Sequence, residues 1–171
     1  MIRPMPDLTS ILRAQMVREL DAFIREVDAF PDDDSLWQVR PGVTNSAGNL
    51  AMHICGNLQD FVGRVLGGTG YVRNREREFS QRAGTRASVI AELRASIVVI
   101  EVVMPALTGA DLEADYTMPL AGHTVNTAVF LVHLGAHLAF HLGQAGYLRR
   151  IVTADNTSTS PLPIAALTSV R

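Results

Sequence analysis

Residues 127–148 read TAVFLVHLGAHLAFHLGQAGYL and contain no aspartate, glutamate, lysine or arginine. A segment of this length and hydropathy could cross a bilayer. It also carries three histidines and a glutamine, which are costly against lipid but can be used where other helices surround them. We therefore expect a buried helix that begins at Thr124 or Asn126 and ends near Arg150, and we expect no membrane partner.

Apolar residues recur every three or four positions in three further stretches, which predicts three more long helices. No alternating pattern of useful length indicates a β-strand. The sequence therefore predicts an all-α protein, a four-helix bundle. The three stretches are residues 7–29, a stretch from a cap among residues 44–46 to the glycine pair 67–68, and a stretch from Thr85 or Ser88 to Pro105.

Length and composition are typical of one globular domain. The chain has 171 residues, of which 47% are hydrophobic and 19% charged. We expect the domain to cover residues 1–152. Residues 153–171, rich in serine, threonine and proline, should form a tail that is ordered only if other residues hold it. The formal net charge of −2 gives no basic face for a nucleic-acid partner.

The cysteine content and the N-terminus indicate a cytoplasmic protein. Cys55 is the single cysteine, so the chain cannot form an internal disulfide. The first residues lack the apolar core of a signal peptide. Cys55 lies two residues from His53, and on a helix that spacing directs the side chains about 160° apart. We interpret Cys55 as a core residue rather than a metal ligand.

Three histidines follow one another at steps of four: His133, His137 and His141. On a helix they share one side, and an adjacent pair can bind one metal ion. The outer two lie roughly 12 Å apart along the helix axis, so only one adjacent pair can close a site. His53, near the apolar face of the second expected helix, could supply a third imidazole.

Three imidazoles favour zinc, nickel, iron, cobalt or copper over magnesium or calcium. Ligands from two helices would leave a coordination position open for water or substrate. A buried hydrogen-bond network, or a cluster of histidines at an interface, remains the alternative interpretation of the same spacing.

Two motifs resemble the DinB-like superfamily of bacterial four-helix proteins, and the resemblance covers roughly residues 8–150. The first is NLAMHICGNL at residues 49–58, followed by GGT at 67–69 and RNREREF at 73–79, which is similar to an uncharacterised branch of that superfamily. The second is HLGAHLAFHLGQ at residues 133–144. It resembles a fourth-helix signature in which two histidines four apart precede Gly-Gln.

The resemblance implies an up-down-down-up bundle, commonly a homodimer, whose divalent metal (zinc, nickel or iron) is held by His53, His137 and His141. Better-characterised members resemble thiol transferases and isomerases that use a low-molecular-weight thiol. The implied function is a metal-dependent S-transferase acting on a small molecule. A bound metal can lower the pKa of a thiol. A metal-dependent hydrolase, a non-catalytic metal-binding or stress-response dimer, and a purely structural bundle remain alternatives.

Several polar side chains fall where they could orient the metal ligands through hydrogen bonds. The candidates are Asn57, Asp60, Gln144 and His133. Of these, His133 is better interpreted as a packed or interface histidine.

An arginine-rich run lies in the expected connection between the second and third helices. Arg73, Arg75 and Arg77 could attract an anionic thiol or a carboxylate substrate. Such a run is more often a solvated loop.

Overall fold

The computed structural model describes residues 6–159 and 162–167. Within these residues the chain forms helices and loops, and it forms no β-strand. Two isolated bridges pair Asp115 with Asn126 and Leu120 with His123. The predicted all-α class is confirmed.

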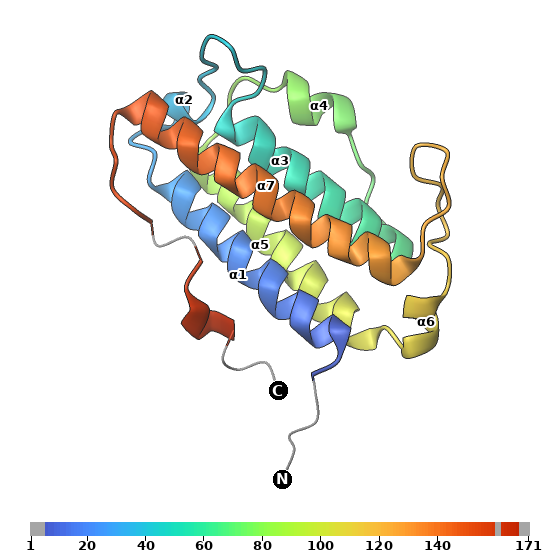
Figure 1. The fold of residues 1–171 in the computed structure, drawn as a ribbon. Helices are drawn as coiled ribbons and strands as arrows, with labels where there is room; N and C mark the ends of the chain where they lie inside the picture. The colour runs from blue at the N-terminus through green and yellow to red at the C-terminus, as the bar shows by residue number, and fades with distance from the viewer. Residues whose placement is uncertain (1–5, 160–161, 168–171) are drawn as a thin grey trace.

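Four long helical segments pack side by side (Figure 1). Helix α1 contacts α5 and α7, and α3 contacts the same two helices. Figure 1 shows α1 and α7 running in one direction and α3 and α5 in the other. The segments are α1 (Leu8–Asp28), α3 (Ala47–Leu58) continued by the π-helix η1 (Gln59–Leu66), α5 (Arg86–Val103) and α7 (Thr127–Thr153).

Shorter helices lie in the connections. Helix α4 falls within residues 71–81, where the sequence indicated only a polar connection, and it packs on α3. The short elements are α2 (Asp33–Leu36), α4 (Arg75–Ser80), the 3₁₀ turn η2 (Met104–Ala106), α6 (Gly109–Glu113) and the 3₁₀ turn η3 (Ile164–Leu167).

Side-chain caps fix where the long helices begin. Ser46 and Asn49 form a reciprocal capping box at the start of α3. Thr85 caps α5 and Asn126 caps α7, each by accepting a hydrogen bond from a backbone N–H three residues later. Helix α5 ends at Val103, before Pro105, as expected. Helix α7 continues three residues beyond the expected end at Arg150.

The core lies between the four long segments. Cys55 belongs to it, and burial raises the pKa of its thiol to about 12, so the core interpretation is confirmed. The fully buried apolar side chains include Leu20 and Phe23 of α1, Ile54 and Leu58 of α3, Leu93 and Ile100 of α5, and Leu131 and Leu138 of α7.

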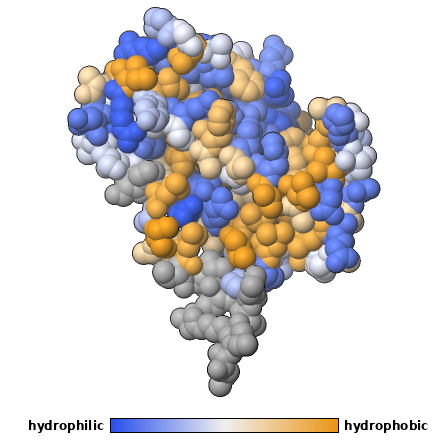
Figure 2. All heavy atoms as spheres, viewed as in Figure 1, coloured by the Kyte–Doolittle hydropathy of each residue, from blue (hydrophilic) through white to orange (hydrophobic). Residues whose placement is uncertain are grey.

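Helix α7 is long and apolar enough to cross a membrane by length and composition alone, which is weak support for a span. One side of it packs on α1 and α3. Its other side is open to solvent and carries a row of exposed apolar residues, which contributes to the apolar surface in Figure 2. These residues are Val129, Val132, Phe140, Tyr147 and Ile151.

A buried ion pair attaches the segment after α7 to α1. The side chain of Arg149 is fully buried, and its Nε donates to Glu26 Oε2 at 2.6 Å. Arg149 Nη2 also donates to the carbonyl oxygen of Thr157 at 2.6 Å, and Arg25 Nε donates to that of Thr159 at 3.1 Å. The first part of the expected tail is therefore held, while residues 160–161 and 168–171 lie outside the described residues.

Candidate metal centre

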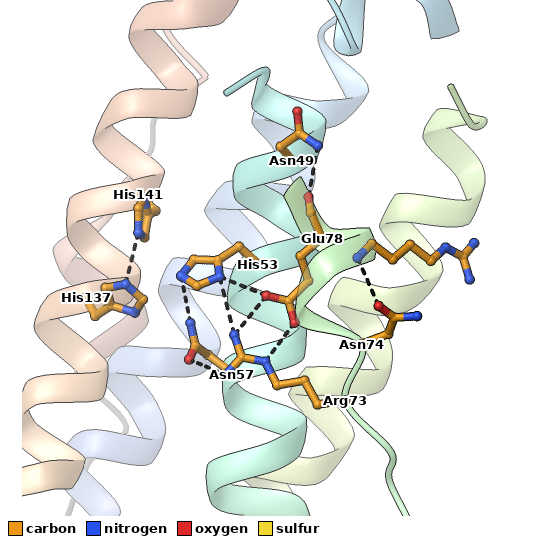
Figure 3. Close-up of polar contacts among 9 residues, drawn as sticks. Asn49, His53, Asn57, Arg73, Asn74, Glu78, His137 and His141 are labelled. Carbon is orange, nitrogen blue, oxygen red and sulfur yellow. Dashed lines mark hydrogen bonds and ion pairs between the residues drawn. The ribbon is translucent and has the colours of Figure 1, made fainter. Parts of the chain in front are cut away.

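The three histidines predicted as metal ligands come together where α3 faces α7 (Figure 3). His53 lies on α3, and His137 and His141 lie one turn apart on α7. One nitrogen from each ring can be chosen so that all three lie within 4.8 Å of one another. The Nε2 atoms of His137 and His141 are 2.9 Å apart. His53 is buried and the other two are half-buried.

These distances fit a single transition-metal ion. Two imidazole nitrogens bound to one tetrahedral zinc ion lie about 3.3 Å apart, because each Zn–N bond measures about 2.0–2.1 Å. The His137 and His141 nitrogens already lie close to that separation. All three histidine nitrogens lie within 4.8 Å of one another, and rotation of the side chains can shorten that distance to the separation of about 3.3 Å expected around zinc.

The carboxylate of Glu78 orients His53. Its Oε2 lies 2.9 Å from His53 Nδ1. An ionised carboxylate can only accept a hydrogen bond, so Nδ1 carries the proton and Nε2 keeps its lone pair. Burial alone would raise the pKa of Glu78, but hydrogen bonds from Arg73 and His53 hold that pKa below its usual value of 4.5.

Several residues of α3 and its neighbours position that carboxylate. Arg73 donates to both oxygens of Glu78, from Nε at 2.7 Å and from Nη2 at 2.8 Å. Asn49 Nδ2 donates to the Glu78 backbone oxygen at 2.9 Å and so attaches α4 to α3. A Cβ atom at Gly56 would lie 2.0 Å from Glu78 Oε1. The carboxylate can therefore reach His53 only because residue 56 has no side chain.

The rings of His137 and His141 are kept neutral. Gln144 Oε1 lies 2.8 Å from His141 Nδ1 and can accept a hydrogen bond from it, which places the proton on Nδ1 and leaves Nε2 unprotonated. Burial, followed by the neighbouring His141 and His53, lowers the pKa of His137 from 6.5 to about 4. Burial also lowers the pKa of His141. Near neutral pH both rings are in the form that binds a metal.

Asn57 connects His53 to Arg73. Its Nδ2 lies 2.9 Å from His53 Nε2, and its Oδ1 accepts from Arg73 Nη1 at 3.1 Å. Asn57 and Gln144, both candidates from the sequence, therefore each lie within hydrogen-bond distance of one of the three histidines.

Asp60 and His133 lie elsewhere. Asp60 is in η1, whose turns are wider than those of an α-helix. It pairs with Arg64 Nε at 2.5 Å rather than with His53, so the structure corrects its expected position. His133 is exposed, and its ring stacks on His137 with 6.0 Å between centroids. Among the described residues it is not part of the group whose nitrogens converge.

The three arginines expected to bind an anion have different surroundings. Arg73 is mostly buried and is paired with Glu78. Arg75 is exposed, and its guanidinium lies over the Phe79 ring at 5.1 Å. Arg77 is exposed and donates from Nε to Gln81 at 3.3 Å. Arg73 and Arg75 line a cleft beside the histidines, and Arg77 does not.

Residues 8–165 match the family described as "Protein of unknown function (DUF1572)". The chain belongs to this family. The match continues past residue 152, where the sequence suggested that the domain ends. Comparisons with curated proteins and with solved structures gave no match.

Sequence reasoning missed Glu78 and Gly56 in this member of the family. Glu78 lies in a run of alternating charges, which is typical of a solvated loop. Nothing in its spacing from His53 shows that α4 folds back onto α3. The one available signal was Gly56, a glycine inside a predicted helix, because such a residue often marks the close approach of another group.

Proposed function

We propose that the chain is a divalent-metal-dependent enzyme of the DinB-like superfamily, with its four long helices in the up-down-down-up arrangement. Two features support this proposal. The first is the direction of the helices, in which α1 and α7 run opposite to α3 and α5 (Figure 1). The second is the pair of histidines on α7 that precedes Gly143 and Gln144.

His53, His137 and His141 are the proposed metal ligands, with zinc, nickel or iron as the metal. The observation that carries the proposal is the convergence of their nitrogens within 4.8 Å from two different helices. The hydrogen bonds of Glu78 and Gln144 add to it. Each can accept a hydrogen bond from Nδ1, so the lone pairs of His53 and His141 lie on Nε2, and a bound metal would replace the Asn57 and His137 contacts made there.

We propose thiol S-transfer as the reaction class, with a low-molecular-weight thiol as the nucleophile. A divalent transition metal, when bound, supplies a Lewis acid that lowers the pKa of a thiol or of water. The chain's own residues orient the imidazoles, and the cleft beside them gives a small molecule access to His53 and His137. Hydrolysis by activated water would use the same histidines and is the alternative within this class.

A non-catalytic role is the second candidate, and it has an observation of its own. Asn57 bonds His53, and His137 bonds His141, so the imidazoles also satisfy one another as a hydrogen-bonded cluster. In that case any metal would stabilise or sense without turning over a substrate.

We also propose that the protein is a cytoplasmic homodimer. The exposed apolar row of α7 supports self-association, because a face of this kind is usually covered in a soluble protein. A two-fold dimer is the commonest soluble assembly. Residues 1–152 are the proposed domain.

The test begins with elemental analysis of protein purified without a histidine tag and reconstituted with zinc, nickel or iron. We expect one metal per chain in the wild type and loss of binding in the His53→Gln and His137→Gln variants, with His123→Gln as the control. His123 is an exposed histidine in a loop. Absence of stoichiometric metal after reconstitution contradicts the proposal.

Catalysis is tested separately. The loaded protein is incubated with several low-molecular-weight thiols and a chromogenic electrophile, with and without chelator. We expect thioether formation that stops when the metal is removed. Turnover that is unaffected by chelator rejects the enzyme proposal, whereas bound metal without turnover favours the non-catalytic role.

A further inference from the structure

A cleft of about 320 Å³ lies directly beside the candidate metal centre. His53 and His137 form part of its wall. Its volume is at the lower end of the range for small-molecule sites, so it fits a small ligand rather than a polymer.

The charged groups of this cleft are all basic. Arg73 and Arg75 line it, and no aspartate or glutamate is among its described lining residues. The charge of Arg73 is met by Glu78, which accepts two hydrogen bonds from its guanidinium. Arg75 contacts the face of Phe79 and forms no ion pair in the described part of the chain. Arg75 is therefore the cation that is free to pair with a ligand.

Apart from Asn57 and His133, the rest of the wall is apolar. Phe61 and Phe130 lie with their ring centroids 5.2 Å apart, and Leu120 and Leu134 extend the same surface. Such a wall favours the hydrocarbon or aromatic part of a ligand, because burying apolar surface is favourable. A single free cation beside an apolar wall suits a molecule with one anionic end.

We propose that the cleft binds a small carboxylate with an apolar or aromatic body, and that Arg75 pairs with the carboxylate. A guanidinium recognises a carboxylate through two parallel hydrogen bonds. The remainder of the ligand then lies along the phenylalanines and beside His53 and His137, which line the same space. This inference rests on the proposed function, since it names the substrate class of that site.

Phenylbutyrate and its uncharged amide, phenylbutyramide, are the probes, and calorimetry measures their binding to the protein kept metal-free with chelator. We expect the wild type to bind the carboxylate about five- to tenfold more tightly than the amide, as for a partly exposed charged hydrogen bond. Arg75→Gln should remove that preference, and Arg75→Lys should restore part of it. Arg77→Gln is the matched control and should keep it, because Arg77 lies on the same helix but outside the cleft.

Equal affinity for the two probes in the wild type, or an unchanged preference in Arg75→Gln, overturns the inference. Raising the salt concentration should weaken only the binding of phenylbutyrate. This measurement needs no variant, so it tests the inference even if a substitution affects folding. Failure of the proposed function gives a different result, because metal analysis would then be negative while the carboxylate preference of the metal-free protein is unaffected.

Discussion

Replacing Glu78 by glutamine removes one negative charge from beside His53 while keeping the size and shape of the side chain. The carboxylate uses one oxygen for Arg73 Nε and the other for both His53 Nδ1 and Arg73 Nη2. An amide has one acceptor oxygen, so it cannot serve both neighbours equally. Arg73 Nη2 lies 3.4 Å from His53 Nδ1, and without the carboxylate this donor favours a lone pair there. The proton of His53 then moves toward Nε2, where the metal should bind.

The expected losses of metal affinity and of stability follow from the contacts of Glu78 with His53 and with Arg73. Loss of the group that orients a metal-bound histidine typically weakens metal affinity by about 10–100-fold, or about 1.4–2.7 kcal/mol. The side chain of Arg73 is 12% exposed and that of Glu78 5% exposed, so the pair is largely shielded from water. Removing one member of a buried pair costs about 3–5 kcal/mol, and the glutamine oxygen recovers part of it. We expect the metal-free variant to lose about 2 kcal/mol of unfolding free energy.

Zinc affinity is measured by competition with a chromophoric chelator, and stability by urea unfolding of the metal-free protein. Glu76→Gln is the matched control, because Glu76 also lies in the first turn of α4 but is exposed. We expect zinc affinity to fall in Glu78→Gln and to change by less than about twofold in Glu76→Gln. A folded Glu78→Gln variant with the zinc affinity of the wild type would refute the role given to the carboxylate.

Three further outcomes are expected. Gly56→Ala places a Cβ atom 2.0 Å from Glu78 Oε1, so it should weaken zinc binding when Glu78 is present. In a Glu78→Ala background the same substitution should weaken zinc binding little further, and a double-mutant cycle measures the difference. The pKa of His137 in the folded state, about 4, lies below its usual value of 6.5, so the unfolded chain takes up a proton first as the pH falls. The metal-free protein should therefore lose thermal stability between about pH 6.5 and pH 4, and a His137→Gln variant with an equally steep loss would contradict this. Glu26→Gln leaves the buried charge of Arg149 with only the half-exposed Asp155, 3.5 Å from Nη1, as its anion, and should cost about 3 kcal/mol of unfolding free energy. Glu26→Leu combined with Arg149→Met should cost less than the sum of those two substitutions made singly.

The sequence predicts the long helices well, because their caps and apolar periodicity are local. Asp7, Thr85 and Asn126 each accept a hydrogen bond from a backbone N–H three residues later, and their side chains are the types that cap helices. The candidate ligands on α7 could also be predicted, since a step of four residues on one helix places two rings together. His53 lies near the apolar face of its own helix, which made it a candidate third ligand, and the family resemblance then implied that it joins the pair.

The remaining features depend on contacts between residues far apart in the sequence. Asp60, at the start of the π-helix η1, pairs with Arg64 rather than with His53, and the spacing from His53 did not indicate this partner. The buried ion pair of Arg149 could not be predicted, because its partner, Glu26, lies 123 residues earlier. No local pattern in the chain indicates either feature.

Helix α4 is a short helix in a connection, whereas the helices that carry the imidazoles are long segments of the main packing. The metal ligands and the residues around them therefore come from different parts of the fold. Helices α3 and α7 belong to the main packing of the protein, so the positions of the three histidines are tied to its core. Helix α4 packs mainly on α3 and supplies both Glu78, which orients His53, and Arg75, which lines the cleft. A substitution at Arg75 can therefore change which ligand binds without disturbing the core. A substitution at Glu78 instead changes the hydrogen bond to His53, and so the metal affinity, while the packing of the long helices stays the same. Ligand preference and metal affinity should accordingly vary independently in variants of this one short helix.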